Sequence, residues 1–95
     1  MAELTFNSPI RRDKWPRWMI KLHEYLKKIY TGPVENPAFE DYKRLVLIIG
    51  EKIRMLHEDV NPNGFLVVCL RRMPDDTFSV SIHRGGKILI TYYLE

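Results

Sequence analysis

Hydrophobic positions in the first third of the chain recur at steps of three and four residues, which is the period of an α-helix. Between residues 13 and 30 these positions are Trp15, Trp18, Met19, Leu22, Tyr25, Leu26 and Ile29. The pattern predicts a helix over residues 13–30, with Asp13 as its N-cap and Gly32-Pro33 as its stop signal.

A second helix is predicted from Asn36, because Asn is a favoured N-cap and Pro37 a favoured first helical residue. Its apolar positions again step by three and four: Phe39, Tyr42, Val46, Ile49, Ile53 and Leu56. Such a narrow seam is typical of coiled-coil packing. The apolar residues outside the seam are Leu45, Leu47 and Ile48. We therefore expect the middle of this helix to be covered on more than one side.

In the last third of the chain, apolar and polar positions alternate, and β-branched and aromatic residues are frequent. This pattern predicts β-strands, because successive side chains of a strand point to opposite faces. The expected strands are residues 65–72, 77–83 and 87–94. Short turn-forming segments separate them, so we predict a three-stranded antiparallel meander.

The register of the last two strands follows from where their large apolar residues must lie. A two-residue turn at Gly85-Gly86 would pair Ile82 with Leu89. A three-residue loop, Arg84–Gly86, instead pairs Ile82 with Ile88 and gathers the large apolar residues on one face, so we predict this loop. On this register the other face displays Arg71, Thr77, Ser79, Ser81, His83, Lys87, Leu89, Thr91 and Tyr93.

Two helices followed by a meander indicate an α+β domain, with two amphipathic helices packed on one face of the sheet. The strand at residues 65–72 is apolar on both faces, so its second face also needs cover. An N-terminal edge strand at residues 4–6 is one candidate for that cover, and a partner chain is another.

The chain of 95 residues has room for one domain, which we expect to span residues 1–95. Its one cysteine, Cys69, excludes an internal disulfide framework and favours a reducing compartment. The first residues do not form a secretory signal, and no apolar run reaches the length of a membrane span. We therefore expect a cytoplasmic protein with no membrane partner.

Amino-acid usage is skewed, since alanine occurs only at positions 2 and 38 and glutamine is absent. Such usage suggests a viral or phage genome, which would place the protein in the host cytoplasm. The spacing of the histidines and the cysteine matches no zinc pattern, and no phosphate loop, dinucleotide fingerprint or nucleophile elbow is present. We expect no metal, cofactor or small-molecule substrate.

These exclusions favour a non-catalytic protein-binding or self-associating accessory domain. Self-association is favoured because a small chain gains useful burial in a homo-oligomer. The residues predicted to form a protein interface are Trp15, Phe65, Val67, Cys69, Leu89 and Tyr93. Alternatively, Trp15 is a lid over the core and Cys69 an inert buried thiol.

The net charge of +3 leaves a second function open, namely binding of RNA or DNA by a basic face of the sheet. Cations there would neutralise phosphates, and an aromatic ring would stack on a base. The residues predicted for this role are Arg71, Arg72, His83, Arg84 and Lys87. The ordinary alternative is a solvated sheet face.

A short strand, two helices and three antiparallel strands, in a small basic chain, resemble the layout of RelE/ParE-type toxins. The resemblance implies a ribonuclease that uses basic and aromatic side chains of the sheet face. The nearest residue types here are Arg71, His83, Arg84, Lys87 and Tyr93. The resemblance rests on topology, without a shared sequence motif, and a fold does not by itself determine a function. We therefore keep it as the enzyme alternative and expect no catalysis.

Overall fold

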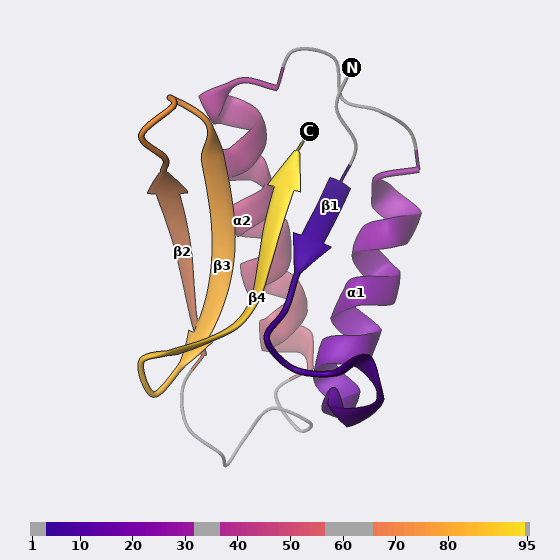
Figure 1. Ribbon diagram of the computed structural model, residues 1–95. Coiled ribbons are helices and arrows are strands. Elements are labelled where there is room, and N and C mark those ends of the chain that lie inside the picture. Colours follow the sequence, from indigo (N-terminus) through magenta and orange to yellow (C-terminus); the bar gives the residue numbers. More distant parts are fainter. Residues whose placement is uncertain (1–3, 32–36, 57–65, 95) are drawn as a thin grey trace.

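The computed structural model describes residues 4–31, 37–56 and 66–94. Two α-helices lie on one side of a four-stranded antiparallel sheet, which confirms the predicted α+β class (Figure 1). The elements are β1 (Leu4–Asn7), a 3₁₀ turn (Arg12–Lys14), α1 (Arg17–Ile29), α2 (Phe39–Met55), β2 (Leu66–Arg72), β3 (Phe78–Arg84) and β4 (Lys87–Leu94).

The sheet contains the predicted meander and, at its edge, the N-terminal strand β1 that we considered for residues 4–6. The strand order is β1-β4-β3-β2, and Leu4 of β1 lies opposite Leu94 of β4. Because β1 and β2 occupy opposite edges, β1 does not cover the second face of β2. That part of the prediction is wrong, and the second face of β2 is left without cover from β1.

Helix α1 begins at Arg17, later than the predicted Asp13. The backbone of Trp15 is extended, because the ring of the following Pro16 disfavours the helical conformation of the residue before it. Asp13 therefore belongs to a separate 3₁₀ turn and is not the N-cap. The predicted stop signal at Gly32-Pro33 lies outside the described residues.

Helix α2 begins at Phe39, and the carboxylate of Asp41 accepts a hydrogen bond of 2.7 Å from the N–H of Ala38. The predicted cap, Asn36, lies outside the described residues. The predicted seam is confirmed at Tyr42 and Ile49, which are buried. Leu45, which we placed outside the seam, is also fully buried, so the contact stripe is broader than a coiled-coil seam.

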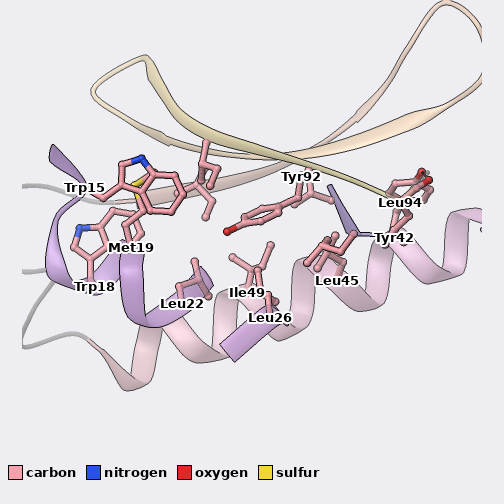
Figure 2. Packing of buried hydrophobic residues seen from close by; sticks show 14 residues of the cluster. Trp15, Trp18, Met19, Leu22, Leu26, Tyr42, Leu45, Ile49, Tyr92 and Leu94 are labelled. Carbon is pink, nitrogen blue, oxygen red and sulfur yellow. Dashed lines mark hydrogen bonds between the residues drawn. The ribbon is translucent and has the colours of Figure 1, made fainter. Parts of the chain in front are cut away.

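The hydrophobic core fills the space between the helices and the sheet, with side chains from both layers pointing toward one another (Figure 2). Its largest fully buried side chains are Trp18, Met19, Leu22, Leu26, Leu45, Ile49, Val80, Ile82, Ile90 and Tyr92. Burial of apolar surface contributes roughly 25 cal/mol per Å², so this layer is the main source of stability.

The turn between β3 and β4 corrects the predicted register. Gly85 and Gly86 both have positive φ, and Arg84 lies opposite Lys87 across this two-residue turn. Next to this turn a β-bulge shifts the pairing of β3 with β4. His83 lies opposite Ile88, but Ile82 lies opposite Ile90. The loop is therefore two residues long, and the extra residue lies inside β4.

A buried histidine lies in an aromatic cluster between α1 and the sheet. His23 is 4% exposed, and its Nδ1 is 3.0 Å from the hydroxyl of Tyr92. The rings of Phe6 and Trp15 contact the imidazole edge to face, at centroid distances of 4.5 and 5.3 Å. Burial, helped by the positive charges of Arg12 and Lys27, holds the pKa of His23 below its ordinary value.

This lowered pKa predicts a loss of stability in mild acid. The unfolded chain binds the proton of His23 more tightly than the folded chain. The contribution to the free energy of unfolding is therefore complete above about pH 6.5 and is lost as the pH falls below it. We expect the melting temperature to fall between about pH 7 and about pH 5.

The variant His23→Gln tests the source of this dependence, with His83→Gln as the matched control. We expect His23→Gln to flatten the dependence of melting temperature on pH and His83→Gln to preserve it. An unchanged dependence in His23→Gln would assign the effect to other groups.

Candidate functional site

The face of the sheet opposite the helices is hollowed. A cavity of about 740 Å³, which we call the open-face hollow, has lining residues from β1, β2, β3 and β4 and from the connections beside them. The lining residues whose side chains can contact a ligand by charge, hydrogen bonding or apolar packing are Arg71, Met73, Ser79, Ser81, Lys87, Ile88, Thr91 and Tyr93. A surface of this kind presents side chains from four strands to one ligand.

The lining combines three kinds of groups. Arg71 and Lys87 supply positive charge. Four lining residues carry hydroxyl groups: Ser79, Ser81, Thr91 and Tyr93. The remainder is largely apolar apart from the amide of Asn7. No carboxylate belongs to the lining within the part of the chain that the structure describes. The hollow therefore suits a ligand with negative charge and some apolar surface.

Ser81 and His83 form a close side-chain pair on this face, with Oγ 2.6 Å from Nε2. A hydroxyl beside an imidazole is the first requirement of nucleophilic catalysis, but the imidazole must also be oriented by a third group. Among the hydrogen bonds of the described residues, none reaches Nδ1 of His83. Ser81 is also buried, so the pair fits a structural hydrogen bond of the sheet face.

The five cations predicted for nucleic acid do not gather on one face. Arg71 lines the open-face hollow, and His83 lies on the same side of the sheet. Lys87 borders the hollow beside the β3–β4 turn, where it lies opposite Arg84. Arg72 lies on the helix side, where it bonds to Asp76 at 2.6 Å, and the guanidinium of Arg84 lies 5.7 Å from the ring centre of Trp18. Adjacent residues of a strand point to opposite faces of the sheet, so Arg71 and Arg72 lie on different faces.

The predicted protein interface is also divided. Val67, Cys69 and Tyr93 share the open face, as predicted, and Val67 is exposed. Phe65 lies outside the described residues.

The structure places two other residues of the predicted interface against the core. Leu89 is the extra residue of the β4 bulge and packs against the core, so Ile88 takes its place on the open face. Trp15 is only 6% exposed, and its indole N–H donates a hydrogen bond of 3.0 Å to the carbonyl of Ile10. Trp15 is therefore a residue of the hydrophobic core.

A second apolar surface lies beside the edge strand β2. Leu47 of α2 is 69% exposed and lines a smaller hollow of about 230 Å³ together with Lys43, Val46 and Leu70 of β2. We expected the middle of α2 to be covered on more than one side, and α2 does pack against both the sheet and α1, with Leu45 buried. Leu47 is the residue of that expectation that stays exposed within the described part of the chain. The sequence signal for this surface was the placement of Leu47 outside the apolar seam.

No protein-family model, curated protein or solved structure matches the chain. Within residues 4–31, 37–56 and 66–94, no group of three or more His, Cys, Asp or Glu side chains is placed to hold a metal ion. In the same ranges no helix has both the length and the hydropathy needed to cross a membrane.

The bulge predicts how two neighbouring substitutions differ. Ile88→Lys places a charge on the open face, where the side chain is already 41% exposed, and we expect only a small change in melting temperature. Leu89→Lys places the same charge against the core, and we expect a loss of more than about 1 kcal/mol. Thermal unfolding of both variants measures the contrast. Equal losses would contradict this assignment of faces.

Proposed function

We propose that this chain is a non-catalytic binding domain, and that its open-face hollow holds an acidic, partly apolar segment of a protein partner. The observation that supports the proposal is the composition of the hollow. It combines two cations, four hydroxyl groups and apolar side chains, without a carboxylate among its described lining residues.

The charges of the hollow favour an acidic ligand over a second copy of the same face. Arg71 and Lys87 are both exposed. If two open faces met, these cations would lie against a surface that carries the same charge, which is unfavourable once water is excluded. A carboxylate of a partner would instead receive charge-assisted hydrogen bonds from Arg71.

The dispersal of the cations favours a protein segment over a nucleic acid. A nucleic-acid strand carries one phosphate per nucleotide, and its affinity rises with the number of phosphates that cations neutralise. Here Arg72 and Arg84 lie on the helix side, which leaves few cations for a backbone on the open face. The apolar lining, with Met73, Ile88 and Tyr93, fits alternate side chains of an extended peptide.

RNA or DNA is a second candidate, because Tyr93 lies in the same hollow as Arg71 and Lys87. A base stacked on the tyrosine with a phosphate on either cation would use the same surface. This candidate predicts affinity that falls steeply as salt rises.

The test of the proposed function is fluorescence anisotropy with a labelled short peptide of alternating Glu and Leu. Arg71 and Arg72 provide a matched pair, since they are adjacent, identical and on opposite faces. We expect Arg71→Glu to weaken binding at least about tenfold. Arg72→Glu should change it little, because Arg72 is away from the hollow.

Equal effects of the two substitutions, or no binding of the peptide by the wild-type protein, would overturn the proposal. The same titration with short single-stranded RNA and DNA at low and physiological salt tests the second candidate. An intact-mass measurement of the RNA after incubation shows whether it has been cleaved. Tighter, salt-sensitive binding of RNA or DNA than of the peptide would replace the protein partner with a nucleic acid.

A further inference from the structure

The outer edge of β2 is the starting point for an inference about assembly. β2 is seven residues long and lies at one end of the described sheet, with β3 as its neighbour. Residues 66–70 are all apolar or cysteine, without a proline or a charge. Long apolar edge strands present unpaired backbone groups that pair readily with another strand.

The helix behind this edge carries a patterned exposed stripe. Residues spaced by three, four, four and three along α2 fall on one side of the helix, and all five are exposed: Glu40, Lys43, Leu47, Glu51 and Arg54. Leu47 stands in the middle of this α2 stripe and lies at a small hollow shared with Leu70 of β2. The apolar edge and the apolar centre of the stripe are therefore neighbours.

We propose that a second copy of this chain binds here, with β2 pairing antiparallel to β2 of the copy about a two-fold axis at Cys69. Cys69 is the midpoint of Leu66–Arg72, so this register pairs the whole strand. Arg71 then lies opposite Val67 of the copy and Arg72 opposite Leu66, so no two cations oppose each other. The two sheets become one eight-stranded sheet.

The α2 stripe matches this arrangement. The same two-fold axis makes the two α2 helices antiparallel on one face of the joined sheet. With the two Leu47 side chains meeting near the axis, Lys43 of each copy faces Glu51 of the other, and Glu40 faces Arg54. A parallel pair would instead set Lys43 against Lys43. Within one chain Lys43 already contacts Glu40 at 3.3 Å, so the copy extends this ion pair into a network.

The distances needed for this contact are ordinary. Paired strands are about 4.8 Å apart, and packed helices have axes about 8–10 Å apart. α2 packs against both β2 and β3, so it lies close to the new strand pair (Figure 1). A single added strand from another protein would cover the edge of β2 but leave Leu47 exposed, whereas a second copy covers both.

The proposed dimer is independent of the proposed function. The helices of both copies lie on one side of the joined sheet, and both open-face hollows stay uncovered on the other side. Loss of the dimer and loss of peptide binding are therefore separate results, measured with different variants.

The first test is the molar mass of the full chain by sedimentation equilibrium. We expect a dimer, with Lys43→Glu weakening it at least about tenfold because the introduced carboxylate would face Glu51 of the copy. The double variant Lys43→Glu/Glu51→Lys restores the opposite charges and should restore the dimer. Lys28→Glu, an exposed charge reversal on α1, is the matched control and should change nothing.

The apolar centre is tested in the same way. Leu47→Lys should dissociate the dimer, whereas Met55→Lys, a substitution on the same helix at an apolar side chain that is 74% exposed, should not. Because Leu47 is exposed in one chain, the variant keeps its fold, which circular dichroism verifies. A monomeric wild type, a dimer unaffected by Leu47→Lys, or no rescue by the double variant would overturn the proposal.

Cys69 provides a test of the register. Residues directly opposite in an antiparallel pair have Cα atoms about 4.5–5.5 Å apart, within the range of a disulfide. We expect a mild oxidant to convert the dimer to a covalent one through Cys69, and Leu47→Lys to slow this reaction. A dimer that does not cross-link through Cys69 would overturn the register centred there.

Discussion

The burial of one face of the sheet under α1 and α2 is the contact on which the remaining features depend. Leu22 of α1 and Ile49 of α2 are fully buried, and Tyr92 of the sheet points toward them (Figure 2). Because strand side chains alternate, fixing this face also fixes which residues lie on the other. The open-face hollow is therefore a product of core packing, and its chemistry is set by residues that lie between the core positions.

Much of the fold could be predicted from periodicity. The two helices, the three C-terminal strands and their antiparallel order follow from the alternation and spacing of apolar residues. Two details of the fold depend on local backbone geometry, and periodicity did not predict them. The ring of Pro16 moved the start of α1, and the Gly85-Gly86 turn placed the extra residue of the hairpin inside β4 rather than in the loop.

The candidate site was less predictable, because proximity in sequence was mistaken for proximity on a face. Arg71 and Arg72 were grouped as neighbours, yet the period of two separates them across the sheet. Leu89 and Ile88 exchanged faces because of one bulge, which hydrophobicity alone does not indicate since both residues are apolar. The buried contact of His23 with Tyr92 joins residues that only the folded chain brings together.

The pairing of β1 with β4 has a consequence for synthesis of the protein. Leu4 pairs with Leu94, so β1 joins the sheet only after β4, about 90 residues later in the sequence, has been made. Until β4 is available, α1 lacks Ile90 and Tyr92 as packing partners, and its apolar side faces water. Closing so long a loop is slow, because its entropy is lost before the contacts form. Exposed apolar surface of this kind is what makes partly folded chains prone to aggregation, so the β1–β4 pairing also ends that exposure.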